Sequence, residues 1–135
     1  MAGITPIEGQ DYIAEVLYSQ DTSPETLLLG LFTNVTDDLT ASSVWADVTV
    51  PTGTGSDEIT LTAGSWSIAS GGVATFPQQS WVADGDWTGD VYGYYLRTQE
   101  GTPRIVHFEY STTGAREMTD GNIYTVDLST NTESA

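Results

Sequence analysis

The chain has 135 residues, of which 39% are hydrophobic and 10% aromatic, a composition that can close one hydrophobic core. Nineteen acidic residues stand against three arginines and no lysine, which gives a formal net charge of -16. Nucleic acid and anionic membrane surfaces are excluded as partners, because both are bound through clustered cations.

One helix is predicted near the start of the chain, over residues 8–19. Tyr12, Ile13, Val16 and Leu17 recur at helical spacing and form one apolar stripe. Acidic residues in the first turn suit the positive end of the helix dipole. The segment DTSP, which comes next, is expected to end the helix.

The pattern then changes to short strands separated by turn signals. The segment TLLLGLF at 26–32 is apolar on both faces, as expected of a central strand. A long polar stretch follows, and within it VWADVTV at 44–50 is predicted to be an edge strand. Gly71 and Gly72 make a turn into VATFP. The remaining predicted strands are EITLT (58–62), SWSIA (65–69), VYGYYLRT (91–98), RIVHFEY (104–110) and IYTVDLS (123–129).

Two of these strands, VYGYYLRT and RIVHFEY, are predicted to form a hairpin around the turn EGTP. Strict alternation along the second strand places Val106 with Phe108 and Tyr110 on one face. The same alternation places Ile105 with His107 on the other face.

One helix followed by several short strands, without the spacing of βαβ units, predicts an all-β fold. We expect a single-domain β-sandwich or jelly roll with a short N-terminal helix. The predicted division is an N-terminal arm over 1–10, the sandwich domain with its helix over 11–129, and a polar tail over 130–135. The sequence MAGITPIEGQ lacks a signal-peptide pattern, and no apolar run reaches membrane-spanning length.

The stretch DGDWTGDVYGYYL begins like a metal-binding loop and ends like a buried strand. Asp84, Asp86 and Asp90 resemble the alternating oxygen ligands of a calcium loop. The bidentate glutamate that would close such a loop is missing, because Tyr95 stands at the twelfth position. We therefore predict an acidic turn with local side-chain hydrogen bonds before a core strand. No metal or other cofactor is expected.

The residues for nucleophilic catalysis are poorly represented. Cysteine is absent, which excludes disulfides, thiolate metal sites and a cysteine nucleophile. His107 is the only histidine, and no G-x-S-x-G nucleophile elbow accompanies it. We expect His107 to be a half-exposed strand residue paired with Glu109, and we expect no catalytic residue.

Aromatic residues raise the possibility of carbohydrate binding. Four tryptophans and seven tyrosines offer faces on which sugars could stack. Trp45 and Trp87 are the candidates for an exposed glycan contact. The alternative, which we favour, is that most of these rings fill the core or an oligomer interface, because a small domain needs bulky side chains.

Several segments, taken in chain order, carry a resemblance to a known family. They are DYIAEVL, LLLGLFTN, EITLTAGSW, VATFPQQSW, GDVYGYYL and DGNIYTVDLS. In this order they resemble a family of small tailed-phage virion proteins, often labelled tail fibre proteins, with related sandwich proteins that decorate or cement capsids. The resemblance covers most of the chain.

The resemblance implies a non-enzymatic virion structural protein at the capsid surface. A decoration or cement protein, as a homotrimer, would bury apolar surface against the major capsid protein and stabilise the assembled shell. We expect Ile4, Pro6 and Ile7 of the sparsely charged arm to lie on that neighbour, although a terminus without fixed structure is the other possibility. The acidic face would point outward. The alternative function is a tail or fibre component that binds a host glycan through Trp45 or Trp87.

Overall fold

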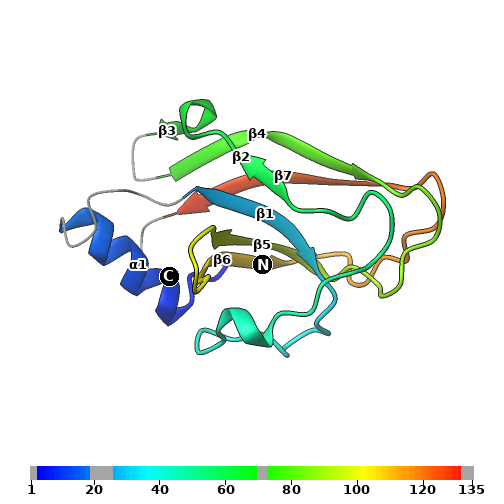
Figure 1. The fold of residues 1–135 in the computed structure, drawn as a ribbon, viewed down its shortest axis with the longest axis horizontal. Coiled ribbons are helices and arrows are strands. Elements are labelled where there is room, and N and C mark those ends of the chain that lie inside the picture. Colours follow the sequence, from blue (N-terminus) through cyan, green and yellow to red (C-terminus); the bar gives the residue numbers. More distant parts are fainter. Residues whose placement is uncertain (1–2, 19–25, 70–72, 132–135) are drawn as a thin grey trace.

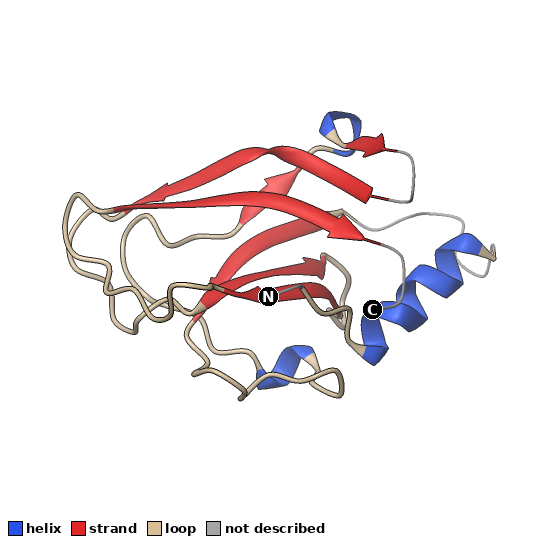
Figure 2. Ribbon diagram, turned by 180° about the vertical axis from the view of Figure 1, so that it is seen from behind, coloured by secondary structure: helices blue, strands red, loops and turns tan. Residues whose placement is uncertain are grey.

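Two antiparallel sheets stacked face to face form the body of the protein, and one helix lies beside them (Figures 1 and 2). The computed structural model describes residues 3–18, 26–69 and 73–131. The four-stranded sheet has the order β2-β1-β5-β6 and consists of β2 (Ile59–Leu61), β1 (Leu27–Phe32), β5 (Gly93–Thr98) and β6 (Ile105–Tyr110). The three-stranded sheet has the order β3-β4-β7 and consists of β3 (Ser67–Ala69), β4 (Val73–Val82) and β7 (Ile123–Asn131). The predicted all-β class with one short helix, α1 (Ile7–Leu17), is confirmed.

The four-stranded sheet is buried on both faces, which explains why β1 is almost continuously apolar. One hydrophobic cluster fills the space between the two sheets and includes Leu29, Leu31, Trp81, Leu96, Val126 and Leu128. A second cluster lies on the other face of the four-stranded sheet and consists of Phe32, Leu39, Tyr95, Ile105, Phe108 and Tyr110. The first cluster joins the sheets, and the second attaches the polar stretch after β1 to the sheet.

The predicted hairpin of β5 and β6 is confirmed, but the predicted faces of β6 are partly wrong. The register shifts between Leu96 and Arg97, so that Val106 has no partner residue on β5. This bulge turns Ile105 to the same face as Phe108, where both are fully buried. Val106 packs instead against the cluster between the sheets. Alternation read from sequence cannot anticipate a bulge.

The edge strand predicted at 44–50 is also wrong, because this segment contains a 3-10 helix, η1 (Trp45–Asp47). The Asp47 carboxylate accepts a hydrogen bond from the Val44 backbone N–H at 2.9 Å, which closes the turn. Asn34 holds the segment in place by donating to the Asp47 carbonyl and accepting from the Thr49 N–H, each at 2.8 Å. Side-chain hydrogen bonds of this kind offer the backbone an alternative to strand pairing.

The boundaries at both ends of the chain differ from the prediction. The helix begins at Ile7, so the arm is shorter than the expected 1–10. At the other end β7 continues to Asn131, and residues 130 and 131 of the expected tail over 130–135 pair with β4. Residues 1–2 and 132–135, the DTSP segment, Gly71 and Gly72 lie outside the described residues. Of the helices in the described ranges, none is long and apolar enough to cross a membrane.

Candidate functional site

The helix α1 is fixed to the start of β6 through its inner face. Gly9 lies so close to the sheet that an added Cβ would be 2.5 Å from the Ile105 carbonyl oxygen and 2.7 Å from that of Val106. Tyr12 is buried. The Glu8 carboxylate accepts a hydrogen bond from the Ile105 N–H at 2.6 Å. Together these contacts attach α1 to the sheet in one orientation.

The outer face of α1 carries large apolar side chains that are open to solvent. Ile7 is 54% exposed, Ile13 38%, Leu17 68% and Tyr18, the residue that caps the helix, 71%. We call these four residues the α1 apolar face. A solvated helix face normally carries polar side chains, and exposed apolar residues that gather together mark interaction sites.

Charged groups border the α1 apolar face. A groove of about 380 Å³ is lined by Asp11, Ala14, Glu15, Tyr18 and Arg104. Arg104 pairs with Glu15 at 3.0 Å and with Glu100 at 3.1 Å, and hydrogen bonding to Glu15 raises the pKa of its guanidinium. An apolar patch with a polar rim is the usual anatomy of a protein–protein interface.

The three residues predicted to contact a partner, Ile4, Pro6 and Ile7, have different positions. Ile4 pairs with Phe108 at the edge of β6, with N···O distances of 2.8 and 2.9 Å in the two directions. Pro6 is fully buried. Only Ile7 is exposed, at the first turn of α1, where it belongs to the α1 apolar face. Ile4 and Pro6 therefore hold the start of the chain against its own sheet.

Trp87 is buried, which corrects its assignment as an exposed glycan contact. Its side chain is 7% exposed and belongs to the cluster between the sheets. The indole N–H donates to the Thr54 carbonyl at 2.9 Å, so its polar atom is also satisfied. Trp87 is a core residue that also fixes the end of the long loop after β1.

Trp45 is half-buried on the outer side of the four-stranded sheet. Its ring lies 5.0 Å from the Tyr95 ring, and the Arg97 guanidinium lies 4.8 Å from its centroid. Arg97 in turn forms two hydrogen bonds of 2.6 Å with Glu58, which also accepts one from Tyr95. Burial opposes ionisation of Glu58, but the bonds from Arg97 and Tyr95 lower its pKa overall. The cluster joins the η1 segment to β5 across the sheet.

The acidic turn after β4 makes long-range contacts. Asp86 accepts a hydrogen bond from the Asp120 N–H at 3.0 Å, and the Asp120 carboxylate accepts one from the Gly85 N–H at 2.9 Å. The hydrogen bond recorded for the Asp86 side chain is therefore long-range, to the loop before β7, and not the local bond predicted for this turn. Asp84 and Asp90 are exposed. Among the described residues, no group of three or more potential ligands could hold a metal ion.

His107 is buried, which corrects its prediction as a half-exposed partner of Glu109. It is 5% exposed, and neither ring nitrogen has a hydrogen-bond partner in the described part of the chain. Its ring faces Tyr94 at 6.1 Å, and Gly3 lies directly against it. Glu109 instead accepts a hydrogen bond from the Tyr94 hydroxyl at 2.7 Å.

The burial of His107 predicts a loss of stability in mild acid. Burial lowers the pKa of His107, and the nearby Glu109 carboxylate only partly opposes this effect. Below the unfolded-state pKa of about 6.5, His107 binds a proton in the unfolded chain but not in the folded chain. The contribution of His107 to the free energy of unfolding is therefore lost as the pH falls. We expect wild type to lose more free energy of unfolding between neutral pH and pH of about 5 than His107→Leu. Urea unfolding of both proteins across this range measures the difference, and parallel curves would contradict it.

Comparisons with known proteins give no family assignment: no family model matches the chain, and no curated protein matches it.

Sequence reasoning missed the outward half of the helix. It grouped Tyr12, Ile13, Val16 and Leu17 into one apolar stripe, but in the structure Tyr12 is buried whereas Ile13 and Leu17 are exposed. The width of the apolar stripe could have indicated this exposure. A helix that packs on one sheet edge buries only a narrow strip, so part of a wide stripe stays exposed. Tyr18 and Arg104, which line the adjacent groove, had no signal in the sequence pattern.

Proposed function

We propose that this protein is a non-enzymatic structural component of a tailed-phage particle, a decoration or cement protein that binds the major capsid protein at the capsid surface. The observation that carries the proposal is the α1 apolar face, a set of large apolar side chains exposed on a helix that is fixed to its sheet. Such a face buries apolar area only when a partner covers it. The order of the segments in the sequence, which resembles small virion proteins, supports the same function.

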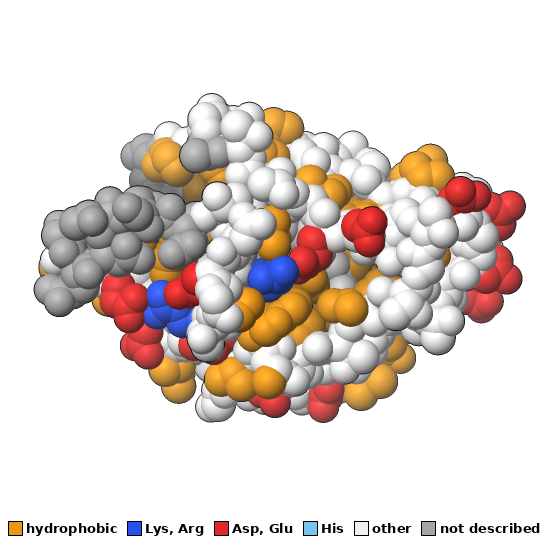
Figure 3. Space-filling view, viewed as in Figure 1, with side chains coloured by type: hydrophobic (Ala, Val, Ile, Leu, Met, Phe, Trp, Pro, Cys, Tyr) orange, Lys and Arg blue, Asp and Glu red, His pale blue; other side chains and the backbone are white. Residues whose placement is uncertain are grey.

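The charge distribution is consistent with this role. On the side shown in Figure 3, the Lys and Arg colour appears only next to acidic side chains, and acidic side chains gather at the right-hand end. Arg97 and Arg104 are held in ion pairs within the molecule, so they do not offset the acidic surface elsewhere. An acidic outer surface would keep neighbouring particles apart.

A jelly-roll arrangement of the strands and a homotrimeric assembly are further parts of the proposal. A three-fold assembly would place three copies of the α1 apolar face around one capsomer junction. Closed symmetry then fixes the number of sites on an icosahedral shell, on the order of hundreds of copies. A tail would offer only a few such sites.

Copy number in purified particles is the direct test. Quantitative mass spectrometry against the major capsid protein is expected to give a high ratio. A low ratio would move the protein to the tail, and absence from the particles would overturn both assignments.

Leu17→Glu is expected to weaken binding to the shell by about 10- to 100-fold, because a leucine contributes roughly 1.5–3 kcal/mol when buried. The folded protein should keep its stability within about 0.5 kcal/mol, since Leu17 is mostly exposed. Co-sedimentation with particles stripped of this chain measures the binding. Ser80→Glu, on an exposed position of β4, adds the same charge elsewhere and should bind as wild type. If Leu17→Glu bound the particles as tightly as wild type, the α1 apolar face would not be the contact with the shell.

A second candidate function, a tail or fibre component that binds a host glycan, depends on Trp45. Its ring is half-exposed, which is the observation in its favour. The Arg97 guanidinium, however, already lies over that ring. Loss of cell adsorption by Trp45→Ala, with normal particle binding, would favour the tail over the capsid surface.

A further inference from the structure

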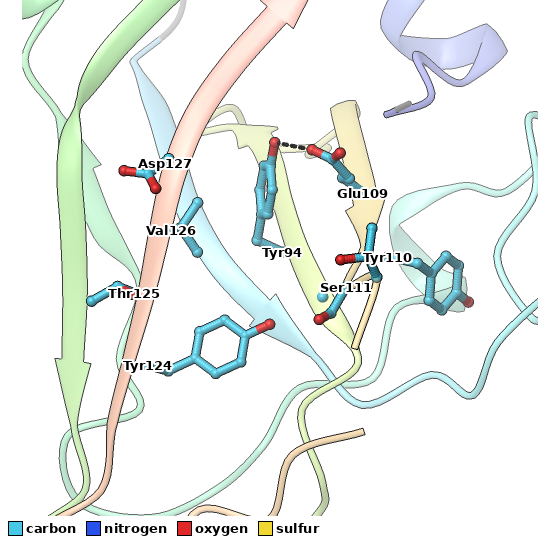
Figure 4. Close-up of a pocket in the computed structure, with 10 residues that line it drawn as sticks. Tyr94, Glu109, Tyr110, Ser111, Tyr124, Thr125, Val126 and Asp127 are labelled. Atoms are coloured by element: carbon cyan, nitrogen blue, oxygen red, sulfur yellow. Dashed lines mark hydrogen bonds between the residues drawn. The ribbon is translucent and has the colours of Figure 1, made fainter. Parts of the chain in front are cut away.

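A cleft of about 200 Å³ opens between the end of β6 and the middle of β7, away from the α1 apolar face (Figure 4). Its lining includes Tyr94 of β5, Glu109 of β6, Ser111 just after β6, and Tyr124 and Val126 of β7. Figure 4 shows Tyr124 and Val126 on the cleft side of β7, with Thr125 and Asp127 on the opposite side. All four of these β7 residues line the cleft, and the side chains of Tyr124 and Val126 point toward it.

The chemistry of the cleft suits a cationic group. The Glu109 carboxylate is half-buried and accepts a hydrogen bond from the Tyr94 hydroxyl at 2.7 Å. Burial, together with Glu109, raises the pKa of Tyr94, so this hydroxyl stays protonated and donates. In the described ranges only Arg97 and Arg104 form ion pairs, and neither pairs with Glu109. A half-buried carboxylate with one tyrosine beside it favours an ammonium or guanidinium group.

One wall of the cleft is an open strand edge. In the described part of the chain β7 pairs only with β4, so it forms the edge of its sheet over nine residues. Half of its backbone N–H and C=O groups face away from β4, because these groups alternate sides along a strand. The edge of β6, by contrast, is covered at Phe108 by Ile4 and at Ile105 by the Glu8 carboxylate. β7 contains no proline or lysine, and within the described ranges no second strand pairs with it, so its free edge is a template for a further strand.

We propose that β7 accepts an extended, basic segment of a partner protein as an added strand, and that a Lys or Arg side chain of this segment enters the cleft and pairs with Glu109. Side chains alternate along an added strand, so the next residue would lie on the outer face, near Asp127. Asp127 is exposed there and accepts a bond from Gln78 at 2.9 Å. Both faces of the added strand thus meet a carboxylate.

A second copy of this chain is a poor occupant of the cleft. The chain has three arginines and no lysine, and two of the arginines are engaged in ion pairs. Two copies paired through β7 would also bring like charges together, because each copy carries a net charge of -16. The same charge attracts a basic partner over a long range. The β7 edge does not involve α1. An experiment can therefore support or overturn strand addition at β7 independently of the proposed capsid contact.

Titration of the isotope-labelled protein with a short peptide, followed by NMR, tests the proposal. The probe is a capped hexapeptide of alternating valine and arginine. We expect amide shifts confined to β7 and the end of β6. Two probes serve as controls: the same peptide with glutamate in place of arginine, and the arginine peptide N-methylated at alternate residues, which keeps its charge but cannot pair as a strand. Both should fail to bind.

Variants of the cleft complete the test. Glu109→Gln keeps an acceptor for Tyr94 and removes the charge, so affinity for the arginine peptide should fall about tenfold. Asp57→Asn removes the same charge at an exposed position outside the cleft and should leave affinity unchanged. No shift at low-millimolar peptide, equal binding of the N-methylated peptide, or unchanged affinity in Glu109→Gln would each overturn the proposal.

Discussion

Replacing Trp87 with alanine is expected to lower the free energy of unfolding by about 3–5 kcal/mol, the usual cost of removing a large aromatic side chain from a core. The indole is buried between the sheets, and its N–H is bonded to the Thr54 carbonyl. The variant therefore loses apolar contact area and leaves a backbone carbonyl without its partner. Urea unfolding followed by far-ultraviolet circular dichroism measures the loss without relying on tryptophan fluorescence.

Trp45→Ala is the matched comparison for this prediction. Trp45 is half-buried and contacts one aromatic ring and one guanidinium, so its removal should cost only about 1–2 kcal/mol. A loss below about 1 kcal/mol in Trp87→Ala would mean that the indole does not support the core, and Trp87 would again be a candidate for a surface contact. The comparison also decides which tryptophan can report on glycan binding without unfolding the protein.

The class of the fold follows from local sequence patterns. The sequence located β1 and β5 through nearly continuous apolar runs, because both strands are buried on both faces. It located β7 through alternation, because side chains that alternate between core and solvent leave a direct mark on the sequence. The bulge at Val106 and the 3-10 turn at Trp45 left no such mark. Both depend on contacts made by other parts of the chain, the first on the register with β5 and the second on Asn34.

The candidate sites were less accessible to sequence reasoning than the fold. A pattern of apolar residues shows that a face is apolar, but the tertiary packing decides which part of it is covered. Leu17 belonged to one apolar stripe in the sequence but is exposed, and Trp87 was a candidate for a glycan contact but is buried. The cleft at Glu109 depends on β6 and β7 lying at neighbouring edges of different sheets, a pairing of distant segments that no local pattern encodes.

Gly9→Ala is expected to weaken the attachment of α1 to β6 and to lower the free energy of unfolding by about 2 kcal/mol. The new Cβ would lie 2.5 to 2.9 Å from backbone atoms of Ile105 and Val106, which cannot move aside without disturbing the sheet. Alanine favours an isolated helix by up to about 1 kcal/mol relative to glycine, so the steric term has to exceed this gain. Hydrogen exchange of the α1 amides, with urea unfolding, measures both effects.

Gly64→Ala is the matched control, since an added Cβ there meets nothing within 4 Å. It should leave stability unchanged or slightly raised.

The two glycine variants also separate two roles of α1 in the proposed capsid contact, because Gly9→Ala keeps the α1 apolar face and alters only the attachment of the helix to the sheet. Weak particle binding by Gly9→Ala and Leu17→Glu, with normal binding by Gly64→Ala, would mean that the face works only when α1 is docked. Normal binding by Gly9→Ala despite faster exchange would mean that the helix binds as a detached element. Unchanged stability and exchange would contradict the close contact at Gly9 itself.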